Sequence, residues 1–170
     1  MDRSQGSLLL TMQTFYHTLR ISIPTVFEGA IGRTSLARCD DRLTDWATSL
    51  IRVTRTQLSA SGHHHIPSEP CIVMSNHQSL SDIPILYAVL PKGMRLRMIA
   101  KAELFKVPIW GRAMRLAGFI PIVRSDRSQA ISSLEEAGRD IRAGTFVWMA
   151  PEGTRSKSGE LGPLKKGGFI

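Results

Sequence analysis

Cysteines are scarce in this chain of 170 residues: Cys39 and Cys71 are the two present, and they lie far apart in the sequence. That number excludes a disulfide framework, so we expect two reduced thiols in a cytosolic setting. No stretch reaches the roughly 18 consecutive apolar residues that a membrane-spanning helix requires. The N-terminus also lacks the basic start, the long apolar run and the cleavage site of a signal peptide, so none is expected.

Several catalytic signatures are missing as well. The sequence contains no Gly-x-Ser-x-Gly nucleophile elbow, no Gly-x4-Gly-Lys-Ser/Thr loop and no Gly-x-Gly-x-x-Gly fingerprint. Neither cysteine lies in a recognisable nucleophile context. The adjacent side chains of His63-His64-His65 point in different directions without a suitably spaced further ligand, so no metal site is predicted. Any catalytic base in this chain would therefore act directly on a substrate hydroxyl, which then attacks an activated acyl group.

What the chain has in excess is positive charge. Its 22 Lys and Arg side chains stand against 14 Asp and Glu side chains, which leaves a formal net charge of +8. This balance favours anionic partners: phosphate esters, anionic lipid headgroups or nucleic acid. Aromatic residues are few and do not alternate with the basic ones, which argues against nucleic acid.

The N-terminal part of the chain, residues 1–58, is predicted to be helical. Its first apolar helical face is formed by Leu8, Met12, Phe15, Tyr16 and Leu19. Pro24 is expected to break or kink this helix. The pattern is consistent with two structures: a helical hairpin packed on the domain, or a monotopic anchor that lies in a bilayer interface.

A second amphipathic helix is predicted from Asp40 to Leu58. One face carries Leu43, Trp46, Ala47, Leu50, Thr54 and Leu58. Arg38, Arg42 and Arg52 lie on the opposite side, where solvent exposure is the expected reason and membrane-surface binding the minority interpretation. Residues 59–70, which contain Gly62, Pro67 and Pro70, are predicted to form a loop.

From residue 71 onward, short apolar runs alternate with helical patterns. Strands are predicted over residues 71–74, 96–100, 119–123 and 145–150, and helices over residues 82–90, 108–117 and 128–143. Gly118 and Gly144 follow two of these helices and are suitable C-terminal stops. The alternation predicts an α/β fold with a largely parallel central sheet that is flanked by helices.

Polar segments follow the predicted strands at 76–82, 101, 124–127 and 151–156. In sheets of this class, reactive groups collect beyond the carboxyl ends of the strands. A neutral imidazole such as that of His77 is well matched to removing a proton near pH 7. Asp82 could fix its tautomer if His77 lies on the turn before a helix and Asp82 in its first turn. The alternative is a capping box, Ser79-x-x-Asp82, in which Asp82 is structural and His77 is a half-buried polar residue.

The segment Pro151-Glu152-Gly153-Thr154-Arg155-Ser156 carries groups that suit an anion. Gly153 lets backbone N–H groups approach a phosphate, Thr154 offers a hydroxyl, and Arg155 offers a planar guanidinium. The plainer interpretation is a polar turn after a strand, with Arg155 solvated. Arg124 could equally be a surface charge beside Asp126.

Three motifs occur together in order: Asn76-His77-x4-Asp82, then Gly118 to Arg124, then Pro151 to Arg155. With these motifs the chain resembles the 1-acyl-sn-glycerol-3-phosphate (lysophosphatidic acid) acyltransferase family over roughly residues 40–170, and the implied fold is glycerolipid acyltransferase-like. Each motif is weak alone, but three in register make the joint match specific.

The resemblance implies a role for each matching residue. His77 would be the general base, with Asp82 as its orienting partner, and Asn76 would help to hold the turn. The implied phosphate-binding residues are Arg124, Glu152, Gly153, Thr154, Arg155 and, from a basic position between the first two motifs, Lys101. No metal, cofactor or covalent intermediate is implied. The co-substrate would be acyl-CoA or acyl-[acyl carrier protein], the acceptor a lysophospholipid, and the product phosphatidic acid.

The resemblance also bears on organisation and location. We expect an N-terminal helical segment at 1–58 that associates with a membrane surface, and a catalytic domain at 59–170. The family has a fourth, Pro-containing apolar motif after the third, so the domain is expected to be incomplete at its C-terminus. The implied location is the cytoplasmic face of a membrane, for instance a bacterial inner membrane, in peripheral or monotopic association. The basic balance suits an anionic leaflet.

Alternatives remain on the sequence alone. Glycerol-3-phosphate and lyso-ornithine lipid acyltransferases share similar first and third motifs, so the acceptor could be either of these. A non-catalytic membrane-binding module would account for the apolar N-terminus and the basic helix. Acyl-chain length, the donor carrier and the oligomeric state are not encoded in these patterns.

Overall fold

The computed structural model describes residues 3–123 and 125–166, with side chains from residue 8 onward. The helices are α1 (Arg3–Ala30), α2 (Leu36–Val53), α3 (Asp82–Val89), α4 (Trp110–Leu116) and α5 (Arg127–Arg142), with short 3-10 helices η1 (His63–His65) and η2 (Ala102–Lys106). The strands are β1 (Ile72–Met74), β2 (Leu96–Lys101), β3 (Ile120–Ile122) and β4 (Phe146–Met149).

In the described part of the chain, the strands form a four-stranded sheet in the order β1-β4-β2-β3. All three pairings are parallel. Parallel neighbours require crossover connections, and the helices between the strands supply them. The prediction of an α/β fold with a parallel sheet is therefore confirmed.

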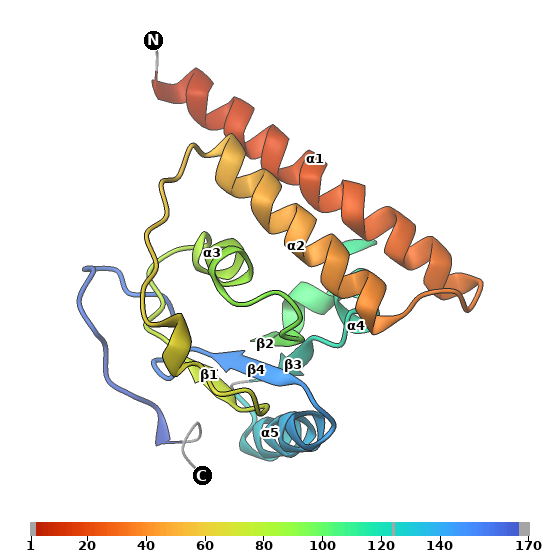
Figure 1. Ribbon diagram of the computed structural model, residues 1–170, viewed down its shortest axis with the longest axis vertical. Helices are drawn as coiled ribbons and strands as arrows, with labels where there is room; N and C mark the ends of the chain where they lie inside the picture. The colour runs from red at the N-terminus through yellow and green to blue at the C-terminus, as the bar shows by residue number, and fades with distance from the viewer. Residues whose placement is uncertain (1–2, 124, 167–170) are drawn as a thin grey trace.

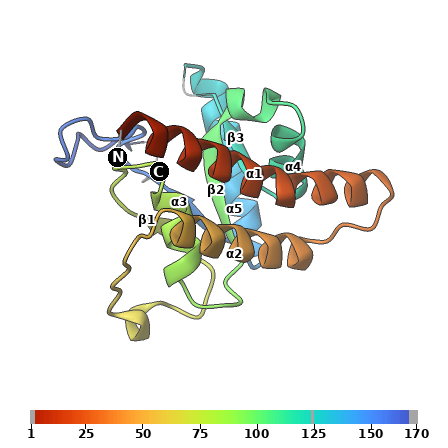
Figure 2. The ribbon, with the colours of Figure 1, turned by 90° about the horizontal axis from the view of Figure 1, so that it is seen from above.

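Helices cover both faces of this sheet (Figures 1 and 2). The core on one side joins Leu96, Met98, Phe146 and Trp148 to residues of α3 such as Leu86. The core on the other side joins Ile120 and Val147 to Ala137 of α5. The hairpin of α1 and α2 lies beyond α3 and α4, which makes it the outermost layer (Figure 1). Alternate residues of each strand point to opposite faces, so β4 can contribute to both cores.

The N-terminal hairpin shares a core with the rest of the chain. Cys39 and Leu43 of α2 are buried against Ala117, with Tyr87 and Phe119 packed around them. Both cysteines are free thiols. Among the residues that the structure describes, no helix is both long and apolar enough to cross a membrane. The division into two domains near residue 58 stays a prediction.

Helix α1 continues through Pro24, so of the two expected effects the break is wrong and the kink stays a prediction. A proline inside a helix costs about 3 kcal/mol because it removes one N–H donor and crowds the preceding turn. Packing on both sides of this position compensates: Ser22 before it and Thr25 after it are 2% and 4% exposed, and Gly29 farther along lies against Leu116 of α4. A Cβ atom on Gly29 would lie 2.5 Å from the Cδ1 atom of Leu116.

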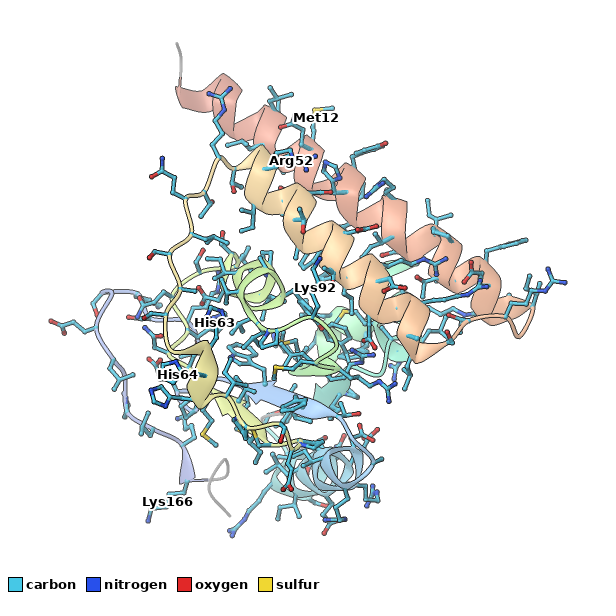
Figure 3. All side chains as sticks on the ribbon, viewed as in Figure 1. Met12, Arg52, His63, His64, Lys92 and Lys166 are labelled. Carbon is cyan, nitrogen blue, oxygen red and sulfur yellow. The ribbon has the colours of Figure 1, made fainter. Side chains whose placement is uncertain are left out.

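The polarity of α1 is inverted relative to a helix that packs on a core. Its buried side chains are polar, with Ser22 at 2% and Thr25 at 4% exposure. Its exposed large apolar side chains are Leu8, Leu9, Leu10, Met12, Phe15, Tyr16, Ile23 and Phe27. Figure 3 shows Met12 on the side of α1 that faces away from α2. The predicted apolar face therefore exists, but it points outward.

Helix α2 runs from residue 36 to residue 53, earlier at both ends than predicted. It starts at residue 36 because Ser35 caps it by accepting a hydrogen bond from the N–H of Arg38 at 3.3 Å. Its predicted inner residues Leu43, Ala47 and Leu50 are buried. The prediction that the basic side of α2 faces solvent is wrong for one residue. Arg42 does not face solvent but donates to Glu28 of α1 at 2.7 Å, which ties the two helices together.

One ion pair in this region has a buried arginine and a partly exposed aspartate. Arg97, in the middle of β2, is 1% exposed, and its Nη1 atom lies 2.6 Å from Oδ1 of Asp40 on α2. The same Nη1 donates to the carbonyl of Leu96 at 2.7 Å. A buried guanidinium without a partner would cost several kcal/mol, so Asp40 stabilises the fold by pairing with Arg97. This pair joins the hairpin to the central sheet.

Candidate active site

The carboxyl ends of all four described strands meet at one edge of the sheet. His77 follows β1, the 151–156 turn follows β4, and Lys101 ends β2. Arg124 follows β3, but it lies outside the described residues, so its predicted role is untouched by the structure. Neighbouring strands are about 4.8 Å apart, so these segments form a continuous rim. Met74 and Met149 are register partners, which places His77 and Glu152 at equivalent positions three residues beyond adjacent strands.

His77 and Asp82 are in contact across the turn that leads into α3. The Nδ1 atom of His77 lies 2.7 Å from Oδ2 of Asp82. An ionised carboxylate only accepts hydrogen bonds, so Nδ1 carries the proton and the lone pair of the neutral ring is on Nε2. Both side chains are 18% exposed. The predicted arrangement is therefore present: His77 lies before the helix and Asp82 in its first turn.

A single oxygen of Asp82 accepts three hydrogen bonds. Besides the ring of His77, Oδ2 accepts the N–H groups of Gln78 at 2.7 Å and Ser79 at 2.9 Å. Burial raises the pKa of Asp82, but the hydrogen bonds from Ser79, His77 and Gln78 outweigh it and hold the pKa below its ordinary value of 3.8. Asp82 is thus ionised at neutral pH.

The capping alternative is present in part. The carboxylate of Asp82 reaches back to the N–H of Ser79, as the acidic member of a capping box does. The Ser79 hydroxyl accepts instead from the N–H of Ser81 at 3.1 Å, so the reciprocal bond of the box is not the one formed. The two interpretations are therefore compatible, because the same carboxylate shapes the turn and holds the imidazole.

Glu152 is turned into the protein. It is 3% exposed, and its two oxygens accept different backbone N–H groups: Oε1 from His77 at 3.1 Å and Oε2 from Gly162 at 2.8 Å. A further hydrogen bond runs from the N–H of Ser156 to the carbonyl of His77 at 2.7 Å. The turn after β4 therefore holds both polar groups of the His77 backbone.

Three other residues that are predicted to bind phosphate, Lys101, Thr154 and Arg155, face solvent at this rim. Thr154 and Arg155 are exposed, and Gly153 has a φ of +70°, a conformation that favours glycine. Lys101 is exposed and forms an ion pair with Glu103 at 3.6 Å. Asn76 is exposed as well. The structure thus brings cationic and hydroxyl groups to the same edge as His77, while their binding role stays a prediction.

The Acyltransferase family model matches residues 57–170, which is more than half of the chain and includes both polar turns. The chain belongs to the Acyltransferase family. Among curated relatives of this chain, a chloroplastic 1-acyl-sn-glycerol-3-phosphate acyltransferase from Brassica napus is 40% identical over 110 residues, which are 64% of this chain and 31% of the relative. Human 1-acyl-sn-glycerol-3-phosphate acyltransferase beta is 42% identical over 103 residues, or 60% of this chain and 36% of the relative.

A bacterial relative and a solved structure extend the match. The 1-acyl-sn-glycerol-3-phosphate acyltransferase of Pseudomonas aeruginosa is 32% identical over 128 residues, which are 75% of this chain and 48% of the relative. The crystal structure of PlsC, the 1-acyl-sn-glycerophosphate acyltransferase of Thermotoga maritima, aligns with a TM-score of 0.74 and 26% identity, covering 98% of this chain and 68% of that one. The matched part of the chain spans 31% to 48% of the length of these curated relatives.

Two residues of this candidate site were not singled out from the sequence. Trp148 of β4 packs edge-on against the His77 ring, with ring centroids 5.4 Å apart and an interplanar angle of 82°. Its Nε1 donates to the hydroxyl of Ser75 at 3.0 Å. A buried tryptophan needs a partner for its N–H, so a polar residue near the end of a neighbouring strand was the signal available.

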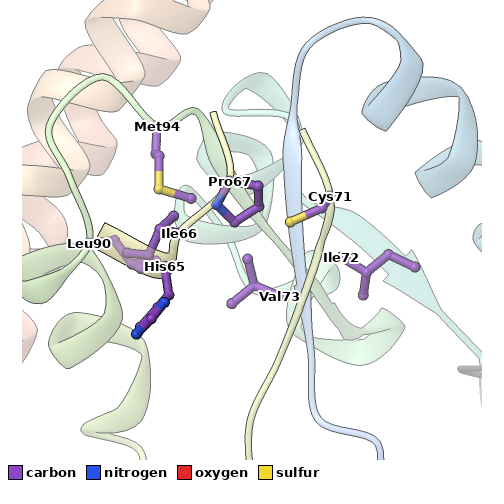
Figure 4. A pocket seen from close by; sticks show the side chains of 8 residues that line it. All are labelled: His65, Ile66, Pro67, Cys71, Ile72, Val73, Leu90 and Met94. Carbon is purple, nitrogen blue, oxygen red and sulfur yellow. The ribbon is translucent and has the colours of Figure 1, made fainter. Parts of the chain in front are cut away.

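An apolar pocket lies elsewhere in this chain. Its walls include Ile66, Cys71, Val73, Leu90 and Met94 (Figure 4). These residues surround the amino end of β1, whereas His77 follows its carboxyl end. The pocket is therefore not the reaction centre. Within residues 3–123 and 125–166, no group of three or more His, Cys, Asp or Glu side chains could hold a metal ion.

Proposed function

We propose that this chain transfers an acyl group from a thioester donor to the free hydroxyl of 1-acyl-sn-glycerol-3-phosphate, giving phosphatidic acid. The observation that carries the proposal is the contact of 2.7 Å between His77 Nδ1 and Asp82 Oδ2. It lies at the sheet edge that also carries Lys101, Thr154 and Arg155. Membership of the Acyltransferase family and the printed names of the relatives support the same reaction.

The residues suffice for direct transfer. The Nε2 atom of His77 would accept the proton of the acceptor hydroxyl as its oxygen attacks the thioester carbonyl. The tetrahedral intermediate would collapse with cleavage of the carbon–sulfur bond, and the imidazolium would return the proton to the departing thiolate. Asp82, ionised because its pKa is lowered, would stabilise the imidazolium between these steps.

The acceptor's phosphate would be held beside the base. Arg155, Thr154, Lys101 and Arg124 supply cationic or hydroxyl donors, and a planar guanidinium suits bidentate phosphate binding. An acceptor without phosphate, such as a lyso-ornithine lipid, would leave these donors without a matching anion. We therefore prefer lysophosphatidic acid to that alternative. The donor would be acyl-CoA or acyl-[acyl carrier protein], with no cofactor.

We also propose that α1 rests on a membrane surface on the cytoplasmic side. The exposed apolar side chains of α1 project away from the protein, and its buried side chains are polar. In water this arrangement exposes a contiguous apolar strip, whereas an interface would cover it. The alternative of a non-catalytic membrane-binding module rests on the same helix, so binding alone does not decide between them.

His77→Ala tests the reaction. The variant is expected to lose acyl transfer, measured as thiol release from acyl-CoA with lysophosphatidic acid, while it still binds lipid vesicles. His64→Ala is the matched control, because His64 lies in the exposed η1 turn. If the wild-type chain binds vesicles but transfers no acyl group, the non-catalytic module is favoured. A panel with glycerol-3-phosphate and lyso-ornithine lipid decides the acceptor.

A double variant tests the membrane surface. Met12 and Phe15 are 62% and 64% exposed, so Met12→Ser with Phe15→Ser should leave folding intact. Each apolar side chain that is buried in an interface contributes about 1.5–3 kcal/mol, so co-sedimentation with anionic vesicles should fall by at least about tenfold. Ile131→Ser on α5, 48% exposed, is the control. Equal co-sedimentation of both variants would contradict the assignment to α1.

A further inference from the structure

We propose that Glu152 is a positioning residue that fixes the backbone of His77, and that it does not bind the acceptor's phosphate. The proposal rests on the proposed acyl transfer, because it concerns the same site. It changes the role of Glu152 from the one that the resemblance to the family implies. The other members of its turn, Thr154 and Arg155, keep their assignment.

The contacts of Glu152 leave no room for a phosphate ligand. Both carboxylate oxygens are already occupied by the N–H groups of His77 and Gly162, and the side chain is 3% exposed. A Cβ atom on Gly162 would lie 2.9 Å from Oε2, so the loop backbone closes directly over the carboxylate. The carboxylate therefore faces the interior and the loop.

The chemistry of a carboxylate and a phosphate ester also argues against direct contact between Glu152 and the acceptor. An ionised carboxylate has acceptors and no donor, and a phosphate ester likewise presents acceptors to its binding site. Two anions in direct contact repel each other, and burial strengthens the repulsion. Backbone N–H groups, by contrast, are suitable partners for a buried carboxylate. Glu152 is thus matched to the peptide groups that it contacts.

The position of the bonds explains what Glu152 does for the base. Its turn holds the peptide of His77 at two points: Glu152 accepts from the N–H, and the N–H of Ser156 donates to the carbonyl. Asp82 holds the ring at Nδ1, and Trp148 packs on it from the strand beside β1. The backbone and the ring are therefore fixed from different elements, and Glu152 provides the hold on the backbone N–H.

Glu152→Gln is the variant that tests this role, with Glu160→Gln as control. The amide keeps one oxygen, and its NH2 group then faces one of the two N–H donors, so one bond is lost. Glu160 is exposed in the loop that follows, so its variant removes the same charge from the surface. We expect kcat for acyl transfer to fall by about 10- to 100-fold, because small displacements of a catalytic group have effects of this size. KM for lysophosphatidic acid should change by less than about twofold, since ground-state binding is spared.

A second variant disturbs the Glu152 carboxylate through its other partner, Gly162. Gly162→Ala leaves Glu152 in place but pushes a methyl group against Oε2. It should reproduce the loss of kcat with little change in KM. Because a buried variant can fail to fold, circular dichroism is recorded for both. If Glu152→Gln does not fold, Gly162→Ala decides.

The backbone amide signal of His77 gives a readout that does not depend on activity. In NMR spectra of the wild-type chain, this amide proton should resonate downfield as a donor to a carboxylate, and it should move upfield in Glu152→Gln but not in Glu160→Gln. An unchanged signal, or a rise in KM with kcat retained, would overturn the positioning role. If the wild-type chain transfers no acyl group while the signal still moves, the proposed reaction fails and the positioning of His77 stands.

Discussion

Replacing Asp82 by Asn separates the charge of this residue from its geometry. All three donors at Asp82 converge on Oδ2: the ring of His77 and the N–H groups of Gln78 and Ser79. An Asn side chain with its oxygen at that point accepts all three bonds, whereas its NH2 group there would face three donors. The amide is therefore held in the orientation that preserves the tautomer of His77, and what is lost is the negative charge.

The size of the effect follows from this geometry. A hydrogen bond to a charged group contributes roughly 1.5–3 kcal/mol and a neutral one about 0.5–1.5 kcal/mol, so the charge accounts for about 1–1.5 kcal/mol. This converts to a loss of about tenfold in kcat for Asp82→Asn. Asp82→Ala removes the orientation as well and should forfeit most of the general-base contribution, about 10²- to 10⁴-fold.

The assay is thiol release from acyl-CoA with lysophosphatidic acid at saturating concentrations, with both variants checked for folding. In triads where the substituted amide imposes the wrong tautomer, the loss is about 10⁴-fold. A loss of that size for Asp82→Asn would show that the amide nitrogen faces His77, which would refute the reasoning from the shared oxygen. Wild-type activity in Asp82→Asn would equally refute it, because the charge would then contribute nothing.

Three further predictions concern stability, each measured by urea unfolding. The lowered pKa of Asp82 contributes stability that is present above its ordinary value of 3.8 and lost as the pH falls through the lower folded value, so Asp82→Asn should flatten the acid limb of the stability curve. Asp40→Ala leaves Arg97 buried without its partner and should lower the free energy of unfolding by about 3–5 kcal/mol, whereas an equal loss for the exposed neighbour Asp41→Ala would contradict this. Gly111→Ala should destabilise, because its Cβ would clash with the backbone of the preceding 3-10 helix, while Gly138→Ala in α5 meets only a flexible side chain end at 3.7 Å and should stabilise by about 0.5–1 kcal/mol.

Local signals predicted most of the elements and the contact at the centre of the site. The stops at Gly118 and Gly144 have the left-handed φ values of +80° and +97° that glycine allows. The contact between His77 and Asp82 could be predicted because both belong to one turn and the first turn of one helix. Strand ends on the same side of a parallel sheet then placed Lys101 and the 151–156 turn near it.

What the sequence could not provide depends on partners distant in the chain. The apolar face of α1 was visible, but its direction depends on which side packs against α2 and α4. The partner of Arg97 is Asp40, on a helix of the hairpin, and no local pattern connects them. The motif containing Glu152 indicates a polar turn, yet the inward direction of this side chain depends on the N–H groups of His77 and Gly162.

The hydrogen bond between Glu152 and the backbone of His77 has a consequence for the order of folding. His77 precedes its backbone partner by 75 positions in the chain, and Glu152 in turn requires Gly162, ten positions later. During synthesis, the turn that bears His77 therefore emerges long before Glu152 and Ser156, which fix its backbone. Closing so long a loop is entropically costly and slow, so the reactive imidazole should gain its final orientation among the last events of folding. A partly made chain would contain Asp82 beside the imidazole but would lack the partners of the His77 backbone.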